Sequence, residues 1–188
     1  MRKALLALAL LLVLVPVAQA DSIMPGFGSV PTGWVTDRYQ PASFSNVGVY
    51  EGRTDVLGIG ISSNDRLAGR AAAFQSTFYN TQGMQYALTG GAGAFLTADL
   101  FIPELWADGA YGAVRTDIWG VLSDATDARS GYPIIGFTNY GGDARYRYWD
   151  YMGDGGWTNV STPVGYDAWT NFGILFTGSS VVYSINGT

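Results

Sequence analysis

The chain has 188 residues, of which 48% are hydrophobic and 14% aromatic, and its formal net charge is −5 at pH 7. It contains no histidine and no cysteine, which excludes a Ser-His-Asp triad, a cysteine nucleophile, a disulfide framework and a histidine-ligated zinc or iron site. We expect no nucleic-acid binding, because that needs a basic stripe, and the arginines are scattered apart from Arg145 and Arg147.

The first 20 residues have the pattern of a secretory signal peptide. Arg2 and Lys3 precede an apolar run over residues 4–15, and small residues, Ala-Gln-Ala, occupy positions 18–20. The apolar run is shorter than the roughly 20 residues that a membrane-spanning helix needs. The sequence therefore predicts cleavage after residue 20, a periplasmic or extracellular location, and no membrane insertion once the peptide has been removed.

From residue 30 onward the chain has the pattern of short strands. Apolar residues recur mostly at every second position, and Gly, Asn, Asp or Pro interrupt them every eight to twelve residues. This rhythm is typical of a β-sandwich or barrel. We expect an N-terminal extension at 21–32 and one all-β domain, a two-sheet antiparallel β-sandwich, at 33–188. The predicted strands are 33–39, 54–61, 72–79, 84–88, 94–101, 113–122, 132–138, 145–151, 169–177 and 180–185.

The segment 132–150 carries the most detailed strand pattern. Residues 132–140 are almost continuously apolar, which predicts a strand covered on both faces. Gly141-Gly142 then predicts a hairpin turn. In the next predicted strand, which begins at Arg145, alternation places Arg145, Arg147 and Trp149 on one face. Tyr146, Tyr148 and Asp150 lie on the other face. We expect the tyrosine face to meet the core, although the size of Trp149 leaves the reverse assignment open.

The last predicted strand leads into Asn186-Gly187 and then Thr188. Asn-Gly strongly favours a two-residue hairpin turn, which joins a strand to a second one. The sequence therefore predicts that the sandwich lacks its last strand, that the chain is truncated at its C-terminal end, and that an unpaired strand edge remains. The alternative is a frayed tail.

Several motifs together carry a family resemblance: GWVTDRYQP at 33–41, FYNTQG at 78–83, WG at 119–120, YPIIGFTN at 132–139, YWD at 148–150 and YSING at 183–187. They resemble a concanavalin A-like lectin/glucanase jelly roll of the laminin-G-like type, found in secreted bacterial proteins of which many carry a C-terminal PEP-CTERM sorting signal. The resemblance implies two antiparallel sheets, one of them concave, with sugar- or ligand-binding loops at one rim. It implies no particular reaction. We expect this chain to depart from the pattern by lacking the membrane-spanning sorting tail and the final strand.

Glucanases of this class commonly use paired carboxylates, in a pattern resembling E-x-D-x-x-E. Glu51 and Glu104 are the only glutamates, and no Glu-x-Asp occurs. We therefore expect a non-enzymatic binding module for carbohydrate or another extracellular surface component. A glycoside hydrolase or lyase that uses Tyr, Arg or Asp is one alternative, and a structural or adhesive matrix protein is another.

Aromatic residues beside amides and charged groups are typical of sugar sites, because flat rings pack against pyranoses while polar groups bind the hydroxyls. Core packing is the alternative for each tryptophan. On one predicted strand Arg115 and Asp117 alternate with Trp119, as a polar concave surface or an ion-pair ladder. The candidate ligand-binding residues lie on neighbouring predicted strands or their loops: Trp119, Asn139, Arg147, Trp149, Asp150 and Trp157.

Calcium is the one metal that the composition permits, because it accepts carboxylate, carbonyl and amide oxygens. Asp150 and Asp154 are the candidate ligands, in the loop Asp-Tyr-Met-Gly-Asp, and the segments 62–65 and 124–127 are weaker candidates. None of these segments has the spacing of an EF-hand, and ordinary turns are the alternative. No other cofactor is expected.

Overall fold

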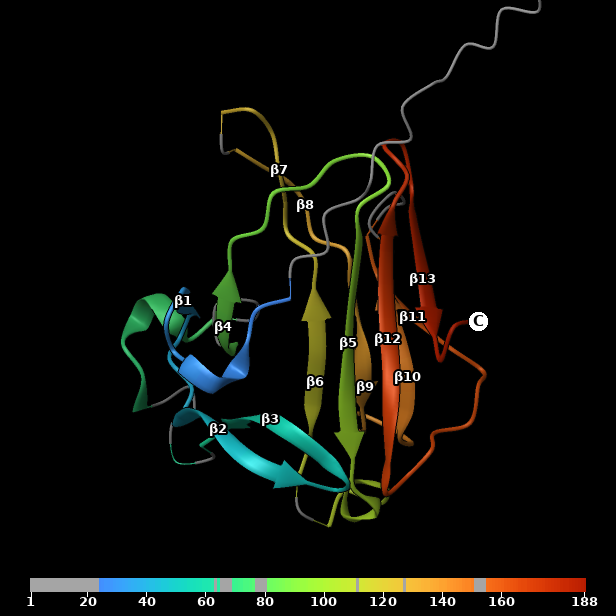
Figure 1. The fold of residues 1–188 in the computed structure, drawn as a ribbon. Helices are drawn as coiled ribbons and strands as arrows, with labels where there is room; N and C mark the ends of the chain where they lie inside the picture. The colour runs from blue at the N-terminus through green and yellow to red at the C-terminus, as the bar shows by residue number, and fades with distance from the viewer. Residues whose placement is uncertain are drawn as a thin grey trace, which may run out of the picture. The chain divides into compact units, whose positions relative to one another are not determined.

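The computed structural model of the chain describes residues 24–62, 64, 69–76, 81–110, 112–126, 128–150 and 155–188. They form two compact units, one ending at Leu88 and one spanning Thr89–Thr188. Both are built from short strands in antiparallel sheets (Figure 1), so the predicted all-β class is confirmed. The predicted signal peptide lies outside the described residues. In the part of the chain that is described, no helix is long and apolar enough to cross a membrane.

The first unit holds two antiparallel strand pairs: β1 (Trp34–Arg38) with β4 (Gln82–Tyr86), and β2 (Ser43–Tyr50) with β3 (Arg53–Gly60). The turn between β2 and β3 is Glu51-Gly52, whose φ angles of 44° and 76° are both positive, as a type I′ turn requires. The sequence did not predict β2, because its serine, asparagine and glycine residues mask the alternation, and register shifts on both sides of Gly48 interrupt its pairing.

The predicted strand at 72–79 is wrong over its described residues. Ala72–Phe74 forms a 3₁₀ turn, η3, in which the Phe74 N–H donates to the Ala71 carbonyl at 2.8 Å. Three successive alanines supply no alternation that would distinguish two strand faces. The Phe74 ring instead packs edge-on against Tyr39, with ring centroids 5.4 Å apart.

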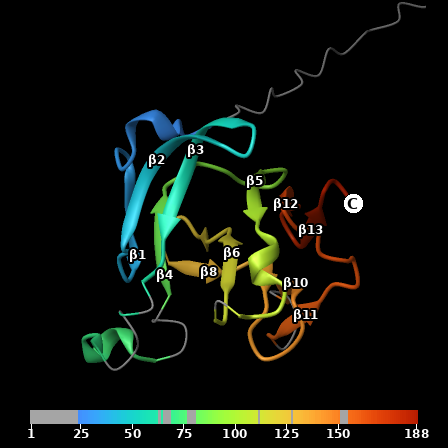
Figure 2. The ribbon, with the colours of Figure 1, turned by 90° about the horizontal axis from the view of Figure 1, so that it is seen from below.

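The second unit contains two main sheets. One has the order β13-β12-β5 and the other the order β11-β10-β9-β6, and Figures 1 and 2 show β12 and β13 on one side of this unit and β10 and β11 on the other. The predicted segment 113–122 is divided between β6 and β7, and β11 was not predicted. The strands are β5 (Phe95–Ile102), β6 (Arg115–Trp119), β7 (Leu122–Ser123), β8 (Arg129–Gly131), β9 (Ile134–Thr138), β10 (Arg145–Trp149), β11 (Trp157–Asn159), β12 (Ala168–Phe176) and β13 (Val181–Ile185).

Side chains from both sheets of the second unit meet in one core. Tyr146 on β10 and Phe172 on β12 make a T-shaped contact, with ring centroids 5.6 Å apart. Burying each of these aromatic side chains removes about 150 to 250 Å² from water, which makes them main sources of stability. The buried core residues are Ile102, Ile135, Phe137, Tyr146, Phe172, Ile174 and Ile185.

The detailed expectations for segment 132–150 are confirmed. All five residues of β9 are buried, as a strand covered on both faces should be. Gly141 and Gly142, with φ angles of 68° and 157°, lie in the turn to β10. Tyr146 is 1% exposed, and Tyr148 stacks on Tyr183 of β13 at 4.9 Å. The tyrosine face of β10 therefore meets the core.

A two-residue turn follows β13. Asn186 and Gly187 have φ angles of 51° and 80°, and Ile185 and Thr188 exchange two main-chain hydrogen bonds of 2.9 and 3.1 Å. The Asn186 side-chain oxygen also accepts a hydrogen bond from the Asn171 N–H at 2.9 Å. The turn predicted at Asn186-Gly187 is thus confirmed, whereas the missing last strand remains a prediction.

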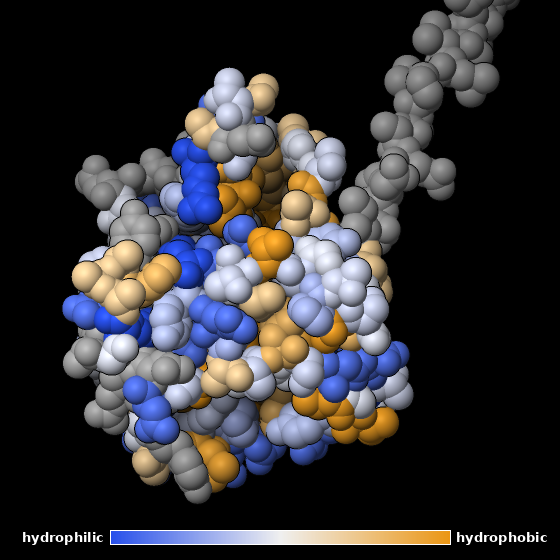
Figure 3. Space-filling model, turned by 90° about the vertical axis from the view of Figure 1, so that its left-hand side faces the viewer, coloured by the Kyte–Doolittle hydropathy of each residue, from blue (hydrophilic) through white to orange (hydrophobic). Residues whose placement is uncertain are grey.

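On the face shown in Figure 3, exposed apolar side chains are dispersed. In Figure 3, hydrophobic residues form small groups separated by hydrophilic ones. Single exposed apolar residues are ordinary on protein surfaces. The face in Figure 3 therefore shows no single broad apolar patch.

We expect Tyr146→Phe to lower the free energy of unfolding by about 1 to 3 kcal/mol, because buried hydrogen-bonding groups lose their partner. The Tyr146 hydroxyl lies 3.1 Å from Thr170 Oγ1 and accepts the Gly165 N–H at 3.0 Å. Urea unfolding measures the change. Tyr140→Phe is the matched control, since the Tyr140 side chain is exposed; equal losses in both variants would contradict this assignment.

Candidate ligand-binding surface

The strand register of the four-stranded sheet gathers the candidate residues on one surface. Paired residues on neighbouring strands point to the same side of a sheet. The side opposite the core is called the outer face; it is accessible only in part, because all five residues of β9 are buried. Its residues form three rows across the strands: Trp119, Ile134, Trp149 and Trp157; Asp117, Gly136, Arg147 and Asn159; and Arg115, Thr138 and Arg145.

Trp157 is the exposed aromatic residue of the outer face, with 41% of its surface accessible. The Arg147 guanidinium covers one side of its ring, with Cζ 3.6 Å from the ring centroid. Trp149 meets the ring edge-on, with centroids 5.4 Å apart. Two neighbours thus fix the orientation of the indole. The exposed side of the ring is the one that Arg147 does not cover.

Arg147 is itself fixed by a buried ion pair with Asp117. Its Nη2 donates to Asp117 Oδ2 at 2.9 Å and its Nε to Oδ1 at 3.4 Å. The side chains are only 8% and 9% exposed. Burial raises the pKa of Asp117 above 3.8, and the charge of Arg147 and its hydrogen bond only partly offset that effect. Asp117 therefore forms a buried ion pair across the sheet with Arg147, which the sequence did not predict; the alternative left open there was a solvated ladder with Arg115 on the same strand.

Gly136 leaves room for this ion pair. It lies on β9 between Asp117 on β6 and Arg147 on β10. A Cβ atom at Gly136 would come within 2.2 Å of the Thr116 carbonyl oxygen and 2.7 Å of Asp117 Oδ1. Because real Cβ contacts are not that short, only glycine allows the two charged side chains to meet across the middle strand.

The other predicted site residues are placed differently. Trp119 lies on the outer face, two strands from Trp149, and contacts Tyr132 edge-on at 6.3 Å. Asn139 follows β9 and holds a neighbouring loop: its Oδ1 accepts the Val114 N–H at 2.6 Å, and its Nδ2 donates to the Trp106 carbonyl at 2.9 Å. The ligand role of Asn139 remains a prediction, without support from this arrangement.

Calcium binding also remains a prediction. Asp150 follows β10, and its N–H donates to the Gly156 carbonyl at 2.8 Å; Asp154 lies outside the described residues. Asp124 Oδ1 accepts hydrogen bonds from Thr126 and Ala128, which lower the pKa of Asp124. This segment therefore forms a turn. Within the described ranges, no group of three or more Asp or Glu residues could hold a metal ion.

The sequence reasoning did not identify Gly136 and Asn159. Asn159 lies on β11, a strand of three residues that is too short to show a clear alternation. Gly136 has the signal of an isolated glycine inside a strand, which often marks the close approach of a neighbouring group. This signal indicates that a neighbouring group comes close to β9, but it does not indicate that Asp117 and Arg147 are the residues involved.

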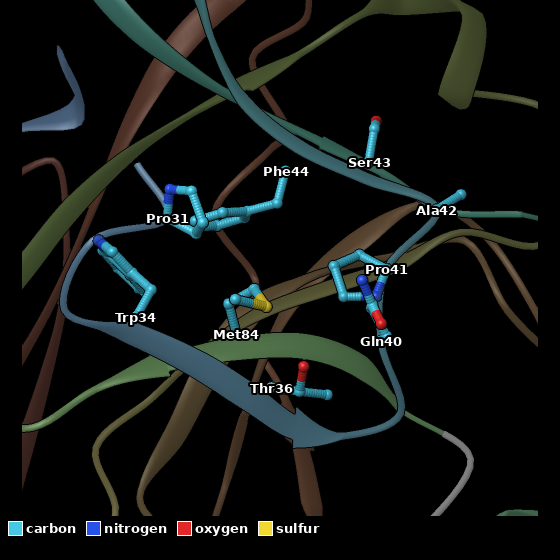
Figure 4. Close-up of a pocket in the computed structure, with 9 residues that line it drawn as sticks. All are labelled: Pro31, Trp34, Thr36, Gln40, Pro41, Ala42, Ser43, Phe44 and Met84. Carbon is cyan, nitrogen blue, oxygen red and sulfur yellow. The ribbon is translucent and has the colours of Figure 1, made fainter. Parts of the chain in front are cut away.

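The first unit has a separate pocket of about 310 Å³ (Figure 4). The Trp34 ring lies at its wall, 5.3 Å from the ring centroids of both Phe44 and Tyr86. Its lining includes no charged residue, which favours an uncharged occupant. The residues that line it are Pro31, Trp34, Thr36, Gln40, Pro41, Ala42, Ser43, Phe44 and Met84.

Comparison with known proteins does not identify a family. No protein-family model, no curated protein and no solved structure matches this chain. The structure defines an all-β protein with several antiparallel sheets.

Gly136→Ala is expected to lower the free energy of unfolding by about 1 to 3 kcal/mol, as overpacked sites usually do. The added methyl group meets main-chain atoms, which cannot turn aside as a flexible side chain can. Chemical denaturation provides the measurement. Gly91→Ala is the control, because a Cβ there meets nothing within 4 Å; a loss of the same size in the control would refute the steric explanation.

Arg147→Met should lower the free energy of unfolding by about 3 to 5 kcal/mol at neutral pH, because it leaves a buried carboxylate without its partner. Since burial raises the pKa of Asp117, acidification protonates this carboxyl group while it is still folded. The deficit relative to the native chain should therefore shrink as the pH falls toward about 4.

The double variant Asp117→Asn with Arg147→Met removes both charges and is the matched control. It should recover most of the stability that Arg147→Met loses. Urea unfolding of the three proteins across the pH range provides the comparison. A deficit that does not change with pH, or a double variant less stable than Arg147→Met, would refute the assignment of a buried ion pair.

Proposed function

We propose that this protein is a secreted, non-enzymatic module of the concanavalin A-like lectin/glucanase jelly-roll type. It binds carbohydrate or another extracellular surface component through the outer face of its four-stranded sheet. The observation that carries the proposal is the half-exposed Trp157 ring, held in place by Trp149 and Arg147.

An aromatic ring held in this way suits a sugar ligand. A pyranose packs its apolar face on an indole, and a side chain already fixed by its neighbours loses little conformational entropy when the ligand binds. Trp149 and Trp157 lie on paired positions of β10 and β11, so the scaffold sets their spacing. Asn159 lies on the same face; its Oδ1 accepts a hydrogen bond from Arg145 Nε, and its Nδ2 can donate to a hydroxyl group of a sugar.

The layered arrangement of the second unit supports the jelly-roll proposal. A three-stranded and a four-stranded antiparallel sheet contribute side chains to one core, which is the basic plan of a two-sheet sandwich. The signal-peptide pattern of the first 20 residues supports export.

A glycoside hydrolase or lyase has less support from the described residues. Glu51 lies in the turn between β2 and β3, and Glu104 begins η4 (Glu104–Trp106), so neither glutamate lies on the outer face. Asp117 is the one carboxylate in the three rows, and Arg147 engages both of its oxygens. A retaining or inverting glycosidase needs two carboxyl groups about 5 to 10 Å apart.

Trp157→Ala is expected to weaken glycan binding by at least about tenfold, a loss typical of a central aromatic contact. A glycan array selects the ligands, and isothermal titration with the best of them measures the affinity. Trp157→Tyr should retain part of the binding, because it keeps a ring. Phe95→Ala removes an exposed aromatic residue from the other sheet and should bind as the native protein does.

Two results would overturn the proposal. One is the absence of binding to every glycan on the array; the other is an unchanged affinity in Trp157→Ala. Release of reducing ends or unsaturated products from a bound polysaccharide would favour the enzyme alternative.

A further inference from the structure

We infer that the outer face selects anionic polysaccharides, whose carboxylate or sulfate groups bind at the guanidinium groups of Arg115 and Arg145. This inference rests on the proposed carbohydrate-binding function and adds the ligand class. It comes from the third row of the outer face, Arg115, Thr138 and Arg145.

Both guanidinium groups contact the same residue, Tyr140. β6 and β10 flank β9 on either side, so Arg115 and Arg145 start about 10 Å apart, at two strand spacings. Arg115 Cζ lies 5.0 Å from the Tyr140 ring centroid, and Arg145 Nη2 donates to the Tyr140 carbonyl oxygen at 3.2 Å. Tyr140 therefore has one arginine at its ring and the other at its main chain.

In the described part of the chain, neither arginine forms a direct ion pair with a carboxylate, although the charge of Arg115 also lowers the pKa of Asp117. The hydrogen-bond acceptors of Arg145 are the amide oxygen of Asn159 at 2.9 Å and the main-chain carbonyls of Asp143 and Tyr140. Arg115 makes its contact with the Tyr140 ring. Asp117 is engaged by Arg147. The three rows thus carry three arginines and one carboxylate, an excess of positive charge in a chain whose net charge is −5.

This positive region is continuous with the exposed tryptophan. Asn159, which accepts the hydrogen bond from Arg145 Nε, lies on β11 two residues after Trp157. A polysaccharide that packs one sugar ring on Trp157 would extend over Asn159 toward the two guanidinium groups. Guanidinium groups bind carboxylate and sulfate oxygens through two parallel hydrogen bonds, so an anionic substituent would be favoured there.

The test compares Arg115→Gln, Arg145→Gln and the double variant with the native chain. Arg129→Gln is the matched control, because it removes the same charge from β8 of the same unit, a strand that contributes no residue to the three rows. Isothermal titration uses polygalacturonate, dextran sulfate and a neutral β-glucan, each at low and high salt. Circular dichroism and thermal melts verify that every variant is folded.

Each single variant should bind the anionic polymers about two- to fivefold more weakly, as expected for exposed charge contacts, and the double variant about tenfold more weakly. Binding of the neutral glucan should not change. Raising the salt to about 1 M should remove most of the difference between polymers, because the screening length falls to about 3 Å. Preference for polygalacturonate or for dextran sulfate identifies the anionic group as carboxylate or sulfate.

Three outcomes would overturn the inference. Equal affinities for the neutral and anionic polymers, with binding still lost in Trp157→Ala, refute the anionic preference and leave the proposed function standing. If Arg129→Gln lost as much affinity for the anionic polymers as the outer-face variants do, binding would depend on the total charge of the protein and not on Arg115 and Arg145. Failure of all three polymers and of every arrayed glycan to bind refutes both proposals.

Discussion

The buried ion pair between Asp117 and Arg147 is the constraint on which the outer face depends. It joins β6 to β10 across the glycine at position 136, and the guanidinium that it fixes also covers one side of the Trp157 ring. The exposed side of that ring is thereby presented by three strands acting together. Any change that releases Arg147 would release the ring as well, so stability and ligand binding depend on the same group.

Ion pairs of this kind contribute more to register than to net stability. Removing two charges from water costs several kcal/mol per ion, and their mutual attraction often only compensates for that cost. A shift of β10 by one residue, however, would turn Arg147 toward the core and leave Asp117 without its partner. The pair therefore penalises misaligned forms of the sheet strongly. The same register brings Trp149 beside Trp157 and places Arg145 opposite Thr138.

The sequence predicted strands well where polar and apolar residues alternate, or where a short apolar run is bounded by turn residues. The strands that contain Tyr146 and Phe172 are of the first kind and the strand that contains Phe137 is of the second, and all three were predicted within a few residues. The segment Ala72–Phe74 is apolar but lacks a polar face, and it forms no strand. On the outer face the tryptophans and Arg147 were predicted, whereas their partners depend on which strands become neighbours, and one sequence does not reveal that order.

The division of aromatic residues between the two faces of β10 connects the fold to the proposed function. Tyr146 and Tyr148 each combine a ring with a hydroxyl group, and Tyr146 uses both against the opposite sheet. Trp149 instead packs against Trp157 at the edge of the sheet. If the tryptophans only filled space, the core would be their more favourable place, because each can bury more apolar surface there than at an edge. Their position on the outer face, with Arg147 over the Trp157 ring, agrees with the proposed ligand, which offers both a flat apolar face and negative charge.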